Sequence, residues 1–519
     1  MANICKELLN ERMPSIKINI AANLVGKIWA AVIAILLIPQ YIKYLGIESY
    51  GLVGFYGTLI GSMALLDLGL STTINRELAK FRSHNRAPQD IRNLTFSLEC
   101  VYWIIGLFIC LLIISMSWFI ASHWVKAEHL PLPVVRQAVM LMGAVIAFQW
   151  PISLYDGALS GLDKQVLNNG ITVVMSTLRA AGVIIILKYY SPTLEAFFLW
   201  QAALSFVYVL IMRWALWKKM PEHHQRPVFS KQQLSTIRRF AVGMTGISVA
   251  TFFLLQIDKI VLSKILPLSQ FGYYTLAFTI ATSIGLIVGP VSISFFPRFS
   301  GLIASNKAEE LKKLYHQACK LMATFIFPIC FVLIFFIKDI LRIWTKNATT
   351  TDSTYLMARI LIIGSMFNAL MVMPYNLLIA HGQTKFTIYQ NTIAAIILVP
   401  MLFWWTNLYG ALGATYVWLI VNAGYVFISQ PLMHRKLLKT ELWTWYWNDT
   451  LLPMIAPLAV VLGLKFSLQY FLPEFQLNLL LIGCIFAITF GISVISMPDT
   501  RVFIKKTYQN LMFNGRDRE

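Results

Sequence analysis

Charged residues are scarce in this chain of 519 residues. They make up 13% of it, whereas hydrophobic residues make up 58% and the mean hydropathy is +0.66. Too few polar side chains are present to cover a water-soluble globule of this size. The composition therefore excludes an ordinary soluble protein and predicts a chain that lies in a lipid bilayer.

Cysteine is also rare, and its positions show neither metal-ligand spacing nor a paired extracellular pattern. The six cysteines lie at the N-terminus or in or beside apolar segments: Cys5, Cys100, Cys110, Cys319, Cys330 and Cys484. We expect them to behave as small buried hydrophobic residues. The sequence thus predicts no disulfide framework and no metal site.

Catalytic motifs are missing as well. The sequence contains no glycine-rich phosphate loop followed by Lys and Ser or Thr, no HExxH motif, and no soluble segment large enough to bind ATP. We therefore expect neither an enzyme nor a bound cofactor. We expect an ion gradient to supply the energy for transport. The net charge of +20 does not indicate a nucleic-acid partner, because the basic residues are dispersed among apolar segments.

Long apolar runs dominate the chain. A helix of about 20 residues crosses roughly 30 Å of hydrocarbon, and fourteen windows reach about that length. They lie near residues 18–38, 50–70, 94–120, 136–160, 168–187, 193–212, 240–263, 271–297, 321–337, 355–380, 386–406, 410–432, 450–472 and 476–496. The prediction is an all-α polytopic membrane protein with about fourteen spans.

The distribution of lysine and arginine predicts the orientation of these spans. With both termini in the cytoplasm, 30 of the 43 basic residues fall in inner segments, 8 in outer loops and 5 inside spans. Short translocated loops avoid positive charge. We therefore expect an even number of spans, with the N- and C-termini in the cytoplasm.

Two halves of the chain resemble each other at an offset of 221 residues. Residues 45–51 read Leu-Gly-Ile-Glu-Ser-Tyr-Gly and residues 266–272 read Leu-Pro-Leu-Ser-Gln-Phe-Gly, each between two membrane-length segments. The same offset carries residues 161–164 onto 382–385. Six spans per copy predict two parallel repeats, and such repeats are typical of transporters with a substrate site between them.

The repeat and the loop composition give the expected division of the chain into five parts. These are a six-helix lobe at 1–217, a basic cytoplasmic linker at 218–239, a second six-helix lobe at 240–435, an appended helix pair at 436–496 and a basic tail at 497–519. The linker should favour anionic lipid headgroups.

Four basic residues in or at the inner ends of spans could form a cationic path for an anionic headgroup: Lys27, Arg76, Arg179 and Arg298. A charge near mid-depth is costly unless it faces a wet cavity or a partner. Arginine offers a planar fork of donors that suits phosphate, whereas lysine acts as a point charge. Snorkelling or a buried ion pair is the alternative for Lys27. Because the positions equivalent to Lys27 and Arg179 in the second copy are uncharged, the first lobe should hold most of the anion.

Uncharged polar residues accompany these cations. Asn19 and Asn23 share a helix face with Lys27, and Ser248 and Thr251 lie on the seventh span, the first of the second copy. We expect all four to line the same cavity. Hydroxyl groups that instead bond their own backbone or join helices are the alternative.

Three membrane carboxylates could bind a proton or Na⁺ and so couple transport to an ion gradient: Asp67, Asp156 and Asp258. A structural pairing with a nearby cation would account for each of them equally well.

Two stretches of the sequence carry short motifs. One is Asp67-Leu68-Gly69-Leu70 followed by Arg76 and Ala79, and the other is residues 256–260 (Gln-Ile-Asp-Lys-Ile) followed by residues 271–274 (Phe-Gly-Tyr-Tyr). Both are similar to the polysaccharide biosynthesis exporters, the Wzx-type flippases of the multidrug/oligosaccharidyl-lipid/polysaccharide superfamily. The resemblance spans about residues 15–435. By motif it extends to Asp67, Arg76 and Asp258 only.

The resemblance implies a two-lobed transporter in the inner membrane of a bacterium. It would flip undecaprenyl-diphosphate-linked oligosaccharide, for O-antigen or a similar surface polysaccharide, from the cytoplasmic to the periplasmic leaflet by alternating access. Partners would be this lipid-linked substrate, H⁺ or Na⁺, membrane lipids, and polysaccharide polymerase and ligase machinery. A cation-coupled exporter of drugs or of other lipids from the same superfamily is one alternative, and a membrane glycosyltransferase or polymerase is another.

Overall fold

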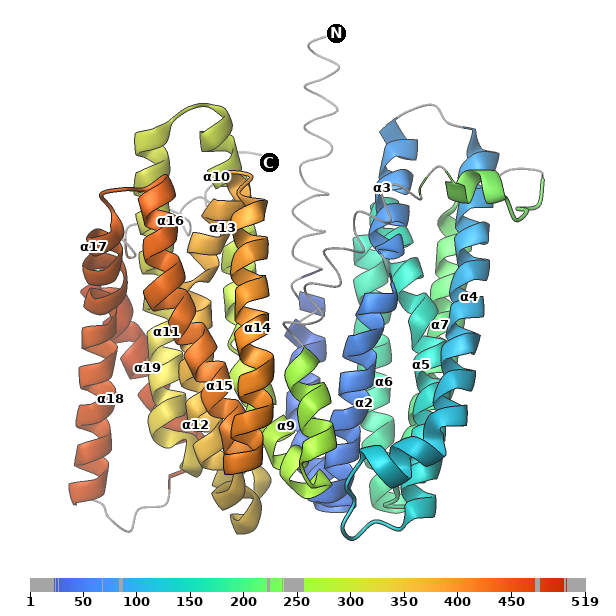
Figure 1. The fold of residues 1–519 in the computed structure, drawn as a ribbon, viewed down its shortest axis with the longest axis horizontal. Coiled ribbons are helices and arrows are strands. Elements are labelled where there is room, and N and C mark those ends of the chain that lie inside the picture. The colour runs from blue at the N-terminus through green and yellow to red at the C-terminus, as the bar shows by residue number, and fades with distance from the viewer. Residues whose placement is uncertain are drawn as a thin grey trace, which may run out of the picture. The chain divides into compact units, whose positions relative to one another are not determined.

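The computed structural model describes residues 28–67, 69–83, 87–221, 225–235, 256–471 and 477–498, together with residues 23, 25, 26, 237 and 501. The chain divides into two compact units, Met1–Gly272 and Tyr273–Glu519, called here the first and second units. Figure 1 shows that long helices running alongside one another build each unit.

Helices account for nearly all of the regular structure, and an isolated bridge between Lys126 and Pro267 is the one strand-like pairing among the described residues. Twelve described helices are long and apolar enough to cross a membrane. The twenty-residue apolar helix α2 (Ile47–Leu66) adds to these, and most of the predicted span 240–263 lies outside the described residues. The predicted all-α polytopic fold is confirmed, and the expected count of about fourteen spans is consistent with it.

The first unit is built around α5. Its helices are Ile28–Leu45, α2, α3 (Leu70–Ser83), α4 (Pro88–Phe119), α5 (Leu132–Gly161), α6 (Gln165–Tyr189) and α7 (Leu194–Lys219). α5 packs against α3, α4 and α7. Close packing on α3 depends on Gly157 and Gly161, because a side chain at either would meet the α3 backbone at Ser71 or Asn75.

The second unit is built around α11. Its helices are α10 (Gly285–Ala304), α11 (Ala308–Thr345), α12 (Ala348–Leu370), α13 (Val372–Ala380), α14 (Thr384–Tyr409), α15 (Ala411–Gly424), α16 (Gln430–Leu437), α17 (Leu442–Thr444), α18 (Leu452–Phe471) and α19 (Leu479–Ser496), and α9 (Leu268–Thr282) runs across the unit boundary. α11 packs against α10, α12, α18 and α19. The predicted five-part division stays a prediction, because residues 238–255 lie outside the described residues.

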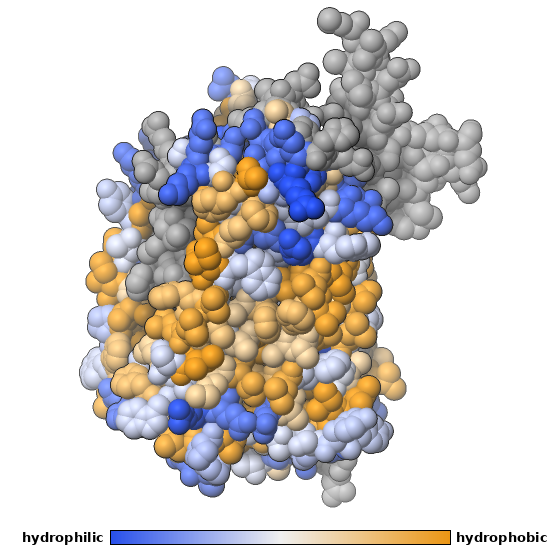
Figure 2. All heavy atoms as spheres, turned by 90° about the vertical axis from the view of Figure 1, so that its right-hand side faces the viewer, coloured by the Kyte–Doolittle hydropathy of each residue, from blue (hydrophilic) through white to orange (hydrophobic). Residues whose placement is uncertain are grey.

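The surface of the first unit matches a bilayer. Figure 2 shows a broad hydrophobic band between two hydrophilic ends. Large apolar side chains on the lipid-length helix α4 are well exposed, among them Ile104, Leu107, Phe108 and Leu111. Such a row would be unfavourable in water and is expected where acyl chains cover the protein.

The two loops that revealed the internal repeat touch each other within the first unit. A Cβ atom added to Gly51 would collide with the carbonyl oxygen of Leu268, and one added to Gly272 would collide with that of Ile47. The backbone N–H of Leu268 also donates a 2.8 Å hydrogen bond to the carbonyl of Lys126. Glycine at both positions therefore permits a close backbone approach.

Candidate functional site

Asp67 lies at the break between α2 and α3. The chain turns there because Gly69 adopts a φ of +69°, which residues with a Cβ rarely adopt. The Oδ2 atom of Asp67 accepts hydrogen bonds from the Ser71 hydroxyl, at 2.7 Å, and from the Ser71 backbone N–H, at 3.4 Å. The carboxylate thus caps the first turn of α3.

The second carboxylate oxygen of Asp67 joins α3 to α4 and α5. Oδ1 accepts a 2.5 Å hydrogen bond from the Tyr102 hydroxyl and a 3.3 Å hydrogen bond from the Ser153 hydroxyl. Tyr102 is fully buried. Sequence analysis identified Asp67 but neither of these partners, because they come from helices 35 and 86 residues further along the chain.

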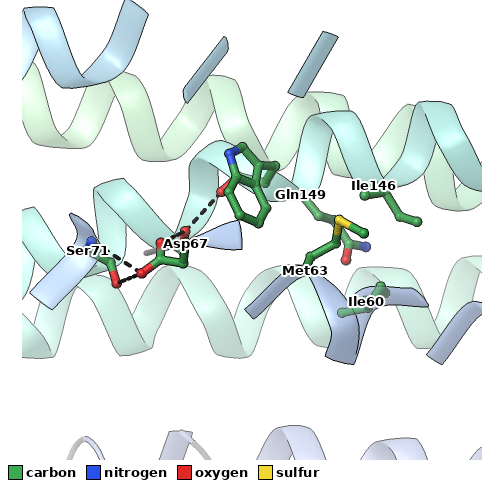
Figure 3. A pocket seen from close by; sticks show the side chains of 8 residues that line it. Ile60, Met63, Asp67, Ser71, Ile146 and Gln149 are labelled. Atoms are coloured by element: carbon green, nitrogen blue, oxygen red, sulfur yellow. Dashed lines mark hydrogen bonds between the residues drawn. The ribbon is translucent and has the colours of Figure 1, made fainter. Parts of the chain in front are cut away.

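A cavity of about 340 Å³ opens beside this carboxylate. Its lining is part polar and part apolar: Ile60, Met63, Asp67, Ser71, Ile146, Gln149, Trp150 and Ser153. Figure 3 shows Asp67 and Ser71 at one end and the side chains of Ile60, Met63 and Ile146 at the other. The indole N–H of Trp150 is buried and has no hydrogen-bond acceptor among the described residues. The cavity therefore combines a carboxylate and neutral polar groups with an apolar wall.

A chain of hydrogen bonds runs from this cavity to Arg179. Gln149 lines the cavity, and its Nε2 donates to the Tyr56 hydroxyl at 2.9 Å and to the Ser205 hydroxyl at 3.2 Å. Arg179 Nη2 donates to the same Ser205 oxygen at 3.2 Å. The structure thus brings the predicted residues Asp67 and Arg179 into one polar region of the first unit, through Gln149 and Ser205, which sequence analysis missed.

Arg179 itself is incompletely paired. It lies near the middle of the membrane-length helix α6. Its Nε is buried without a hydrogen-bond acceptor, and within the described part of the chain it forms no ion pair. In the second unit, by contrast, Arg359 Nε donates to the carbonyl of Ile334 at 3.1 Å. Arg179 therefore leaves donor capacity and positive charge available inside a membrane span.

The polar residues of α6 extend the site along one helix face. Asn168, Thr172, Ser176 and Arg179 recur at intervals of four, four and three residues. The Asn168 amide donates to the carboxylate of Asp156, a predicted ion-coupling residue, and the Thr172 hydroxyl lies 3.1 Å from that of Tyr208. Their spacing could have revealed this stripe in the sequence.

The first helix packs against α6. The Asn169 amide donates to Asn23 Oδ1 at 2.5 Å, and the Trp29 indole donates to the Thr177 hydroxyl at 2.9 Å. Asn23, predicted to line a cavity, therefore joins two helices. The other polar candidates of the two lining spans lie outside the described residues: Asn19, Lys27, Ser248 and Thr251.

None of the remaining predicted residues that the structure describes lines the cavity beside Asp67. Arg76 is exposed on α3 and does not line the cavity. Arg298 belongs to the second unit, where its guanidinium lies 5.9 Å from the ring centre of Phe295. Asp258 is buried, and Lys259 Nζ lies 3.4 Å from its Oδ1. A shared path for all four predicted cations stays a prediction.

Comparison with known families gives two matches. The model of the family described as "Polysaccharide biosynthesis protein" matches residues 16–303, and the MatE family model matches residues 245–404. A curated relative from Shigella flexneri, named "Putative O-antigen transporter", is 24% identical over 399 residues, which cover 77% of this chain and 93% of the relative.

Solved structures share the fold. The structure titled "Lipid II flippase MurJ, inward closed conformation" aligns with a TM-score of 0.66 at 15% identity, over 95% of this chain and 99% of that one. An inward-facing multidrug resistance MATE family transporter of the MOP superfamily aligns with a TM-score of 0.58 at 15% identity, over 79% and 96%. At these sequence identities the structural similarity shows a shared fold and does not show a shared function.

Proposed function

Because the chain belongs to the polysaccharide biosynthesis protein family, we propose that it flips undecaprenyl-diphosphate-linked oligosaccharide repeat units from the cytoplasmic to the periplasmic leaflet of a bacterial inner membrane. The chain is a multi-pass membrane transporter. The name of the Shigella relative supports O-antigen or a similar surface polysaccharide as the product that the substrate serves.

The observation that carries the proposal is the incompletely paired guanidinium of Arg179 within a membrane span. A buried charge without a partner is unfavourable, so such groups face a wet cavity or a ligand. A diphosphate supplies the complementary charge, and guanidinium donors match phosphate oxygens in geometry. Lys27, expected on the first span, would add a second cation.

The neutral polar groups around Arg179 suit the sugar part of the substrate. Sugar hydroxyls both donate and accept hydrogen bonds, and side-chain amides and hydroxyls can do the same. Gln149, Asn168 and Thr172 supply such groups from α5 and α6. The apolar wall beside Asp67 would exclude water from part of the cavity.

Asp67 is the proposed site of ion coupling. Protonation would turn one of its acceptor oxygens into a donor, so the bond from Tyr102 or from Ser71 would have to rearrange. Because Asp67 caps α3 at the α2–α3 break, proton binding there would change how the two helices meet. Na⁺ binding to the carboxylate is the other form of the same coupling.

The orientation completes the proposal. The excess of basic residues in alternate loops supports cytoplasmic N- and C-termini. The flipped lipid would then reach the polysaccharide polymerase and ligase machinery at the periplasmic face.

Deletion of the gene followed by complementation tests the function. Without the protein, lipid-linked repeat units should accumulate on the cytoplasmic face and surface polysaccharide should be lost. The wild-type chain should restore both, whereas a chain with Arg179→Gln at equal abundance should not. Normal surface polysaccharide in the deletion strain would refute the proposal.

A cation-coupled drug exporter is the second candidate, because the MatE family model matches residues 245–404. Cationic drugs favour acidic rather than basic side chains in the cavity that binds them, and Arg179 argues against this reading. Drug sensitivity of the deletion strain separates the two functions: the flippase proposal expects no change.

A further inference from the structure

A second cavity, of about 330 Å³, lies near the C-terminal end of α7 and shares no lining residue with the cavity beside Asp67. It is lined by Leu210, Arg213, Trp214, Trp217 and Lys218. The transport proposal uses none of these residues. Basic and aromatic side chains at the end of a membrane helix are typical of the part of a protein that lies beside lipid headgroups.

A buried carboxylate holds one wall of this cavity in place. Glu99 of α4 is only 3% exposed. It accepts hydrogen bonds from Arg213 Nε at 2.5 Å, from Trp217 Nε1 at 3.1 Å and from the Tyr155 hydroxyl at 2.7 Å. The Arg213 side chain nevertheless remains 48% exposed. The guanidinium is therefore fixed in position and still accessible at the cavity.

The cavity carries an excess of positive charge. The Lys218 ammonium lies 4.8 Å from the ring centre of Trp214, and the Arg92 guanidinium lies 5.5 Å from that of Trp217. Of the cations Arg92, Arg213 and Lys218, only Arg213 forms an ion pair with a described residue, and that residue is Glu99. The lining can therefore accept an anion without losing an existing ion pair.

An exposed apolar row leads along α7 to this cavity. Phe206, Leu210 and Trp214 are 44%, 45% and 62% exposed and recur every four residues, so that they share one face of the helix. Lys218 follows at the next four-residue step. Such a row can take an acyl chain, and the cation at its end lies where the headgroup of that chain would be.

The start of the basic linker is held against α4 by two hydrogen bonds. Arg92 Nη1 donates to the carbonyl of Pro221 at 2.9 Å, and the Ser230 backbone N–H donates to the Ser97 hydroxyl at 2.8 Å. The linker is thus fixed on the N-terminal part of α4. The orientation expected from the positive charges puts this end of α7 at the cytoplasmic leaflet.

We propose that this cavity binds the phosphate of an anionic glycerophospholipid of the cytoplasmic leaflet. Arg213 and Lys218 bind the phosphate oxygens, the Trp214 indole lies at the level of the headgroup, and one acyl chain follows Phe206 and Leu210. Basic residues at the cytoplasmic end of a membrane helix attract such headgroups. The site does not depend on what the protein transports.

Lipid binding to the purified full-length chain, counted by native mass spectrometry, tests the site. Dioleoyl phosphatidylglycerol should bind more tightly than dioleoyl phosphatidylcholine, which has no net charge. Lys218→Gln should weaken binding of the anionic lipid by about fivefold, and Trp214→Leu should weaken it as well. Both changes leave the pair of Glu99 and Arg213 intact, so the fold should survive.

Lys219→Gln is the matched control, because Lys219 is the next residue of the same helix and does not line the cavity. Equal binding by the Lys218 and Lys219 variants, or equal binding of the two lipids, would overturn the proposal. Undecaprenyl phosphate and inorganic phosphate serve as competitors. Stronger displacement by undecaprenyl phosphate than by the phospholipid itself would make this a polyprenyl site, and displacement by millimolar inorganic phosphate would make it a free-phosphate site. Either result would refute the phospholipid assignment.

Discussion

Gly51 and Gly272, which are 221 positions apart, make equivalent contacts with each other's repeat. Gly51 packs against the carbonyl of Leu268, and Gly272 packs against the carbonyl of Ile47, the residue 221 positions before Leu268. Reciprocal contacts of this kind are typical of a two-fold interface, in which residue i touches j and j touches i. The repeat seen as similar loops in the sequence is thus also a packing relationship inside the first unit.

Gly51→Ala and Gly272→Ala should each destabilise the protein, because the new methyl group meets a backbone oxygen that cannot rotate away. Overpacking of this kind costs about 1–3 kcal/mol. The measurement is the midpoint of thermal unfolding of the purified chain. Gly57→Ala, in the same helix α2, is the control, because a Cβ atom there has no neighbour within 4 Å. Equal midpoints for all three variants would disprove the close contact.

Hydropathy predicted most of the fold because it depends on local sequence. An apolar run of membrane length has few alternatives to a helix. Less of the candidate site could be predicted from the sequence. Asp67 and Arg179 stand out as charges in apolar segments, but Gln149 and Ser205 do not. Their role arises only when α5, α6 and α7 pack together, and residue patterns in one sequence do not reveal which helices pack against each other. The row of polar residues on one face of α6, in contrast, could have been predicted from the spacing of those residues in the sequence.

Arg179→Gln should reduce export of surface polysaccharide by about tenfold or more, because a charged hydrogen bond to the substrate would be lost. Arg179→Lys should retain part of the activity, since the charge remains and the fork of donors does not. Lys188→Gln is the control on the same helix. Polysaccharide at the cell surface is quantified against the membrane abundance of each variant. Full export by Arg179→Gln would exclude the cationic site, and Lys27→Ala tests the second cation in the same way.

Asp67→Asn should uncouple transport from the ion gradient while leaving the α2–α3 junction in place. An asparagine oxygen can still cap α3, whereas Asp67→Ala would also lose a cap worth about 1 kcal/mol. Export is measured with and without an imposed proton or sodium gradient, beside Asp156→Asn as the rival site. If the Asp67→Asn variant still responds to the gradient and the Asp156→Asn variant does not, the coupling residue is Asp156.

Fusions to the C-terminus test the orientation on which both the transport direction and the lipid site depend. Thirty of the 43 basic residues fall in segments assigned to the cytoplasm, so a green fluorescent protein fused after Glu519 should fluoresce. Alkaline phosphatase at the same place should be inactive, because it folds only after export to the periplasm. A second fusion within the outer loop after α4, near His129, should show the opposite pattern. Active phosphatase at the C-terminus would reverse the predicted topology. The second cavity, near the C-terminal end of α7, would then lie in the periplasmic leaflet, and the position of the basic linker would contradict the positive-inside rule.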